Sequence, residues 1–290
     1  MAEKQTSRNI IRITEDAVKK FLAGVATTQK GILRRVNGTL RQLELKAGAI
    51  LPNQFNIRLK RELEADLPSL VVDNAYKARV DTYLRNFDKI KRESDSLFKA
   101  TLAGFNSNKQ VYKEILNDAL SLTRKSLLET GINSNVIDPI INIVNSGITS
   151  GAQISDMEET LRTQIIGDQN RLGGLERYSS QITRDALNQY SANYNESVSG
   201  TENMEWYFYS GTIIEDSRSY CIARAGKYFH KKEVEKVPQQ WDGRIPGTNS
   251  SNIFINRGGF NCRHLYLPVL INVVPKDVIE RNIRNGNFSP

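Results

Sequence analysis

The stretch YKARVDTYLRNFDKIKRESDSL, residues 76–97, decides the fold of this chain. Its apolar side chains recur four and three positions apart, so they fall along one side of a helix of about three heptads. Such a seam needs a covering helix, and we expect the cover to come from the same chain. A partner helix, including one in a homo-oligomer, is the alternative. The seam residues are Tyr76, Val80, Tyr83, Phe87, Ile90 and Leu97, interrupted only by Ser94.

Helical spacing of apolar residues continues on both sides of this stretch. The pattern predicts helices over residues 16–43, 57–70, 111–127, 134–148, 155–165 and 175–196. Gly48 and Pro52 indicate a turn, and Gly131 is expected to cap the helix before it in the αL conformation. Ser155-Asp-Met-Glu158 has the pattern of a capping box. We therefore predict that residues 1–198 form an elongated, almost wholly α-helical region.

The composition of the 290-residue chain limits the classes of protein to which it could belong. Lys and Arg number 40 against 32 Asp and Glu, and the resulting charge of +8 is spread along the chain. This charge allows weak, nonspecific contact with DNA phosphates and equally fits a solubilising surface. With only two cysteines, the chain is not a disulfide-stapled secreted scaffold. No apolar run approaches the roughly 20 residues of a membrane span, so we expect no membrane partner.

The pattern changes near Gly200. The aromatic run Glu205-Trp-Tyr-Phe-Tyr209 predicts a buried strand, and residues 260–269 predict a second one. Short helices are expected around Cys221 and over 232–236, and a terminal helix over 275–285. We predict a small α+β module over residues 199–290. The expected fold class is mainly α, with a long helical N-terminal region followed by this module.

The residues that could carry chemistry gather in the module, and their first interpretation is a zinc site. All four Cys and His side chains of the chain, Cys221, His230, Cys262 and His264, would complete a tetrahedral shell. On a strand, Cys262 and His264 would point to the same side. Against this interpretation, Cys221 and His230 lack the close spacing typical of zinc ligands.

Two other interpretations compete with zinc. In the second, Cys262 or Cys221 is the nucleophile of a hydrolase or transferase, with His264 or His230 as its base. No oxyanion loop or nucleophile elbow accompanies them. In the third, the thiols are buried packing groups. We favour the third interpretation and predict a protein with no catalytic residue and no cofactor.

The structural interpretation also assigns roles to residues beside the cysteines. Asp216 would pair with Arg218 or Arg263 and pin the loop before the Cys221 helix to the second strand. Gly258 and Gly259 would supply a backbone kink that leads into that strand.

Two segments of the module resemble a known family. Asp216-Ser-Arg-Ser-Tyr-Cys221-Ile-Ala-Arg-Ala-Gly226 is followed by Arg257-Gly-Gly-Phe-Asn-Cys-Arg-His264 and by Pro268-Val269. This order resembles the C-terminal module of phage minor head proteins, the head morphogenesis family related to protein F of phage Mu. Residues 155–161 and 178–193 resemble the family's helical lead-in, so the likeness covers residues 130–270. The motif residues are Asp216, Arg218, Cys221, Arg224, Gly226, Gly258, Gly259, Asn261, Cys262, Arg263 and His264.

The chain also departs from the family's common pattern, in which the last motif reads His-Pro-Asn-Cys-Arg-Cys and a second cysteine follows the first. Gly259 and Phe260 stand where His and Pro would be, and His264 replaces the final Cys. These departures leave fewer candidate metal ligands.

The resemblance implies a low-copy virion protein of the capsid interior or portal vertex, made in the host cytoplasm. Its implied partners are the portal protein and/or capsid or scaffold proteins. Its implied role is in head morphogenesis, DNA packaging or DNA delivery. A thiol-dependent enzyme and a DNA-binding module are the alternatives.

Overall fold

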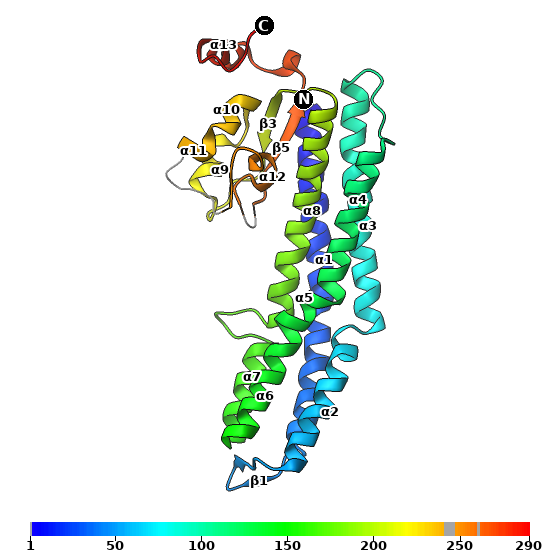
Figure 1. Ribbon diagram of the computed structural model, residues 1–290, viewed down its shortest axis with the longest axis vertical. Helices are drawn as coiled ribbons and strands as arrows, with labels where there is room; N and C mark the ends of the chain where they lie inside the picture. The colour runs from blue at the N-terminus through cyan, green and yellow to red at the C-terminus, as the bar shows by residue number, and fades with distance from the viewer. Residues whose placement is uncertain (1, 241–246, 260–261) are drawn as a thin grey trace. The chain divides into compact units, whose positions relative to one another are not determined.

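The computed structural model in Figure 1 describes residues 2–240, 247–259 and 262–290. The chain is mainly α-helical with a small α+β region near its C-terminus, which confirms the predicted fold class. The helical part contains α1 (Ala2–Leu40), α2 (Gln54–Val71), α3 (Asn74–Thr101), α4 (Gln110–Leu128), α5 (Thr130–Ile132), the π-helical turn η1 (Asn133–Ile137), α6 (Asp138–Ser150), α7 (Ile154–Ile165) and α8 (Gly174–Thr201).

The α+β region follows α8 and alternates short strands with short helices. Its elements are β3 (Trp206–Ser210), α9 (Ser219–Arg224), β4 (Lys227–His230), α10 (Lys231–Glu235), α11 (Val237–Gln240), α12 (Ile253–Asn256), β5 (Leu265–Val269), the 3-10 turn η2 (Ile271–Val273) and α13 (Lys276–Arg284).

The chain divides into two compact units that do not follow the order of the sequence. The mixed unit comprises Met1–Asp16, Arg85–Leu120 and Arg184–Pro290. The helical unit comprises Ala17–Leu84 and Ser121–Thr183. Helices α1, α3, α4 and α8 therefore each contribute residues to both units, and the α+β region belongs wholly to the mixed unit. The division of the sequence at residue 198 stays a prediction.

The apolar seam of residues 76–97 is buried within the chain. In the helical unit, Tyr76 and Tyr83 pack edge-on against Phe21 of α1, with ring centroids 5.8 and 5.6 Å apart. In the mixed unit, Phe87 packs against Tyr190 of α8 at 5.3 Å. All six seam residues are at most 5% exposed. The cover therefore comes from the same chain, and the seam is not exposed for a partner helix or a homo-oligomer.

Helix α1 begins at Ala2, well before residue 16, where the apolar pattern starts. Its first turns bury polar side chains, so apolar periodicity does not reveal them. Within the mixed unit these buried polar residues are Glu3, Thr6, Ser7 and Thr14.

Two local predictions in the helical unit are wrong. Gly131 lies inside α5 without a positive φ, and an added Cβ would collide with the hydroxyl of Tyr178. This glycine therefore allows a close approach of Tyr178 and does not cap a helix. Helix α7 begins at Ile154, so Ser155 lies inside it and its hydroxyl contacts Asp156 at 3.3 Å instead of forming a capping box.

The turn expected at Gly48 closes a two-stranded hairpin of β1 (Leu45–Lys46) and β2 (Ala49–Ile50). Ala47 and Gly48 have φ angles of 51° and 80°, the left-handed region that tight hairpin turns use at both central positions.

The α+β region is built on a three-stranded antiparallel sheet in the order β4-β3-β5, with β3 and β5 side by side in Figure 1. Side chains alternate along the central strand, so its aromatic residues divide between two faces. One face packs into the thiol cluster: Tyr207, Tyr209, Tyr220, Cys221, Val234, Ile253, Phe254, Cys262 and Tyr266. The other packs into the tryptophan cluster: Trp206, Phe208, Tyr228, Val269 and Val274, joined by Val278, Ile279 and Phe288.

Candidate functional site

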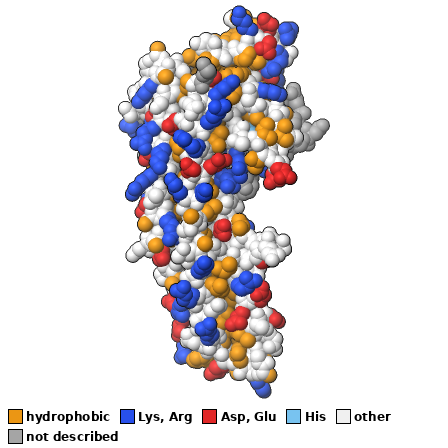
Figure 2. All heavy atoms as spheres, turned by 180° about the vertical axis from the view of Figure 1, so that it is seen from behind, with side chains coloured by type: hydrophobic (Ala, Val, Ile, Leu, Met, Phe, Trp, Pro, Cys, Tyr) orange, Lys and Arg blue, Asp and Glu red, His pale blue; other side chains and the backbone are white. Residues whose placement is uncertain are grey.

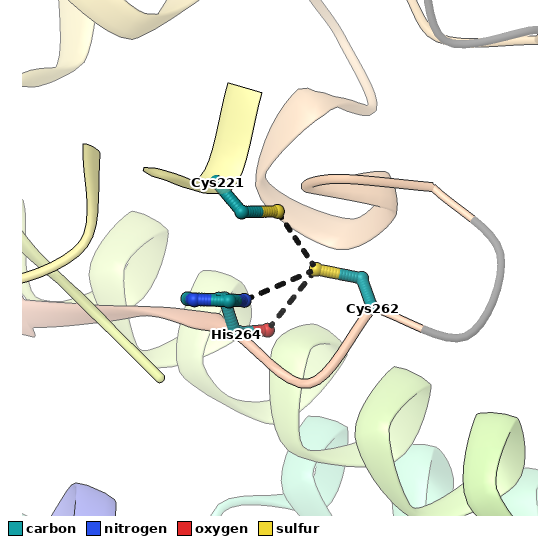
Figure 3. A group of neighbouring side chains, drawn as sticks. All are labelled: Cys221, Cys262 and His264. Carbon is teal, nitrogen blue, oxygen red and sulfur yellow. Dashed lines mark hydrogen bonds between the residues drawn. The ribbon is translucent and has the colours of Figure 1, made fainter. Parts of the chain in front are cut away.

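Three side chains of the mixed unit converge beside the sheet, and we call Cys221, Cys262 and His264 the ligand triad (Figure 3). The two sulfurs lie 3.8 Å apart, and Cys262 Sγ lies 3.9 Å from His264 Nδ1. One potential ligand atom from each residue lies within 4.8 Å of the other two. Each side chain is only 3% exposed, so a thiol pair and an imidazole share one buried space.

The triad is assembled from a helix and a loop. Cys221 lies on α9, whose first turn follows Arg218 as the N-cap. Cys262 and His264 precede β5, which begins at Leu265 rather than at the predicted residue 260. The two side chains therefore meet through the loop conformation, and the strand geometry expected for them is wrong.

Tyr209 of β3 connects all three triad members, and sequence reasoning did not assign it to the site. Its hydroxyl lies 3.4 Å from Cys221 Sγ and 3.8 Å from Cys262 Sγ. Its ring stacks on that of His264, with centroids 5.3 Å apart and planes 5° apart. The alternation of β3 could have placed Tyr209 on a buried face, but not beside the thiols.

Two glycines bring backbone directly against the triad. A Cβ on Gly258 would lie 2.9 Å from Cys262 Sγ and closer still to Cys221 Sγ. A Cβ on Gly211 would lie 2.7 Å from His264 Cα and closer still to its ring. The predicted importance of Gly258 thus has a steric cause, whereas Gly211 was missed. Gly259, with a φ of 84°, turns the chain after α12 as expected.

Helix α8 is hydrogen-bonded to the loop that carries Cys262. Asn188 donates its side-chain amide to the carbonyl oxygen of Cys262 at 3.2 Å. Arg257 is buried and donates to the carbonyl oxygen of Asn188 at 2.8 Å, while its own φ of 52° is unusual for a residue with a side chain. These hydrogen bonds fix the backbone around Cys262 and thereby the position of its sulfur.

The closeness of the two sulfurs shifts the pKa values of their thiols in opposite directions. A hydrogen bond with Cys221 lowers the pKa of the Cys262 thiol and outweighs burial, which acts in the opposite direction. The same hydrogen bond, together with burial, raises the pKa of Cys221. His264 and Arg257 also lower the pKa of Cys262. Cys262 is therefore the more acidic thiol of the pair.

A cavity of about 40 Å³ opens beside the triad. It is lined by Thr212, Ile214, Asp216, Ser217, Arg218, Cys221, Cys262, Arg263 and His264. Asp216, which the sequence predicted to pair with Arg218 or Arg263, is exposed at this cavity. Nη1 of Arg263 instead lies 3.7 Å from Glu15 Oε1.

His230 lies apart from the triad, so the structure does not bring together the four zinc ligands that the sequence offered as an alternative. It ends β4 and packs edge-on against Trp206, with ring centroids 4.9 Å apart. Its Nδ1 accepts a hydrogen bond from the backbone N–H of Lys232 at 3.2 Å and thereby caps α10. This side chain belongs to the opposite face of the sheet.

The remaining motif residues shape the surroundings of α9. The guanidinium of Arg224 stacks over the ring of Tyr220 at 4.2 Å. Gly226 has a φ of 79° and donates its N–H to the carbonyl oxygen of Tyr209 at 2.8 Å, which starts the turn into β4. Asn261 lies outside the described residues.

Comparison with known proteins returns no match for this chain among family models, curated proteins or solved structures. Within the described part of the chain, no helix is both long enough and apolar enough to cross a membrane.

Proposed function

We propose that this protein is a structural component of a phage head that acts at the portal vertex in head morphogenesis, DNA packaging or DNA delivery. The proposal depends on the resemblance of segments 216–226 and 257–269 to minor head proteins. One observation supports it above others: these segments pack together around Cys221 and Cys262, which are 41 positions apart in the sequence. Segments that form a single module are expected to do so.

The burial of the triad supports a structural role over the thiol-enzyme alternative. A nucleophilic sulfur has to be reached by the atom that it attacks. Both sulfurs are only 3% exposed, and the cavity beside them has a volume of about 40 Å³. That space admits a few water molecules or an ion rather than a peptide or nucleotide.

The distribution of charge supports only weak contact with DNA. Figure 2 shows Lys and Arg side chains distributed over the visible face and interspersed with Asp and Glu. Phosphate binding strengthens with the number of basic groups that reach the backbone together. A DNA-binding module would need them on one continuous surface, so we assign the main partner as protein.

The test is co-sedimentation of the full-length protein with a purified portal ring. We expect the protein to sediment with the ring at moderate salt and to remain in the supernatant without it. A helical protein of similar size and charge serves as the control for nonspecific attraction. Free sedimentation of our protein at every salt concentration would contradict the proposal.

A matched pair of variants then locates the docking surface. Leu122 in the helical unit is 66% exposed, and Ile213 in the mixed unit is 51% exposed. We propose that the helical part of the chain docks on the portal or capsid proteins. We therefore expect Leu122→Glu to weaken co-sedimentation and Ile213→Glu to leave it unchanged. The reverse result would place the docking surface on the mixed unit.

A further inference from the structure

We propose that Cys221, Cys262 and His264 bind a zinc ion. This inference concerns the chemistry of the triad and does not depend on the proposed function in the phage head. It departs from the packing role that the sequence favoured for the thiols, and it differs from the four-ligand zinc site considered there, because the second histidine lies on the other face of the sheet.

The distance between the sulfurs matches a shared metal. Two thiolates at about 2.3 Å from a tetrahedral zinc ion are about 3.8 Å apart, and Cys221 Sγ and Cys262 Sγ are 3.8 Å apart. A disulfide would require a separation of about 2.05 Å. His264 Nδ1 lies 3.9 Å from Cys262 Sγ, and one ligand atom from each of the three residues lies within 4.8 Å of the other two. Figure 3 shows the Cys221 sulfur and a ring nitrogen of His264 both directed toward the sulfur of Cys262.

The burial of the triad suits a bound cation. Cys221 and Cys262 are both buried, and two buried thiolates would be costly without a countercharge. A divalent ion bound by two thiolates removes that cost, because the sulfurs have to be deprotonated to bind it. The Nε2 atom of His264 is buried without a hydrogen-bond partner, whereas Nδ1 faces the sulfurs. A proton on Nε2 would leave the Nδ1 lone pair free to coordinate.

The ligand types select zinc over the commoner hard cations. Thiolates and imidazole are soft to borderline ligands that suit zinc, whereas magnesium and calcium prefer oxygen. Three protein ligands leave one of the four tetrahedral positions open. The cavity of about 40 Å³ borders the same three side chains, and its volume is sufficient for a water ligand.

The backbone around the triad is also shaped for these three side chains. Gly258 and Gly211 leave no room for a methyl group against the sulfurs and the imidazole, respectively. Asn188 fixes the carbonyl oxygen of Cys262 from α8. Metal ligands have to be held in position by the groups around them, and these contacts hold the three side chains.

The test measures zinc in the full-length protein purified without chelators, by elemental analysis after gel filtration. We expect one zinc ion per chain. Cys221→Ser, Cys262→Ser and His264→Asn should each lower the zinc affinity by at least ~10-fold, because each removes a ligand. His230→Asn is the matched control: it changes the other buried histidine, retains a capping acceptor, and should keep the zinc.

Replacing zinc with cobalt tests which atoms bind the metal, because the absorption spectrum of cobalt depends on its ligands. A site with two sulfurs and one nitrogen should give intense sulfur-to-cobalt charge-transfer absorption and strong visible bands. Both should be weaker in the His264→Asn and cysteine variants at the same cobalt concentration, and the charge-transfer band should fall most in the cysteine variants, which lose a sulfur ligand. Protein without zinc after incubation with the metal and washing would overturn the proposal. So would equal zinc retention in Cys262→Ser and wild type, equal loss in His230→Asn, or a mass spectrum showing a Cys221–Cys262 disulfide.

A measurement on the wild-type protein tests the proposal without substitutions, in case the variants do not fold. The two thiols are the only ones in the sequence, so alkylation followed by mass spectrometry reports on them alone. We expect slow alkylation of zinc-loaded protein and at least ~10-fold faster alkylation after a chelator has removed the metal. Equal rates in the two states would contradict metal binding by these sulfurs.

Discussion

The two faces of the β4-β3-β5 sheet each hold one buried histidine, yet they have different chemistry. On one face, His264 lies against two thiols and stacks on Tyr209. On the other face, His230 packs against Trp206 and caps a helix. The central strand causes this separation, because Tyr207 and Tyr209 point to one side and Trp206 and Phe208 to the other. A histidine's role here is decided by the face to which its strand or loop assigns it.

The largest expected effect tests whether the two faces are independent. Trp206→Ala removes the largest side chain of the tryptophan cluster, which is 3% exposed, and should lower the free energy of unfolding by about 3–5 kcal/mol. Urea denaturation measures the change. The protein that remains folded should keep its zinc, because the triad lies on the opposite face. Loss of zinc together with stability would show that the faces are coupled.

Zinc itself should produce the next largest effect. Free zinc at about a hundred times its Kd should stabilise the native state by about 2.7 kcal/mol, provided that the unfolded chain does not bind it. Thermal unfolding with and without a chelator measures this difference. His264→Asn should reduce the zinc stabilisation at the same zinc concentration to about 1.4 kcal/mol or less, and His230→Asn should preserve it. A wild-type Tm that does not respond to zinc would contradict the site.

A smaller effect is expected at the glycine that faces the sulfurs. Gly258→Ala should lower the free energy of unfolding by about 1–3 kcal/mol, because the new methyl group overlaps both sulfurs. Gly200→Ala is the control, since no atom lies within 4 Å of its added Cβ and it lies in α8. The control should be neutral or stabilising by about 0.5–1 kcal/mol. Equal changes in the free energy of unfolding for Gly258→Ala and Gly200→Ala would contradict a steric clash between the new methyl group and the sulfurs.

The smallest effect concerns the histidine of the tryptophan cluster. Burial lowers the pKa of His230 below its ordinary value of 6.5, so the folded state keeps the ring neutral where the unfolded chain takes up a proton. Its contribution to stability is therefore fully present above about pH 6.5 and is lost as the pH falls through the lowered pKa. Denaturation between pH 7 and pH 5 should show a shallower decline in His230→Asn than in wild type. Identical slopes would mean that His230 does not titrate differently on folding.

Most helices of this protein could be predicted because apolar periodicity is a local property. The seam of residues 76–97 is visible in the sequence. A continuous apolar stripe along one side of a helix predicts that this side faces the core. The first turns of α1 were missed because buried polar residues such as Glu3 and Ser7 take apolar positions there. The packing role of Gly131 was missed because Tyr178, whose hydroxyl occupies the space that a Cβ would need, is distant in the sequence.

The site could be predicted only in part. The sequence placed Cys221, Cys262 and His264 among the candidates, since it contains few residues capable of such chemistry. It could not place Tyr209 and Gly211 beside them, because those contacts depend on how a loop returns to the sheet.

The amino-acid sequence by itself determined the mainly helical architecture, the change to an α+β region near Gly200, and the small set of side chains that could bind a metal. Only the tertiary structure decided that one histidine joins the two cysteines while the other does not. The physical reason is that hydrophobic periodicity acts over neighbouring residues, whereas the meeting of Cys221 with Cys262 requires sheet pairing, a glycine without a side chain, and a loop held by α8.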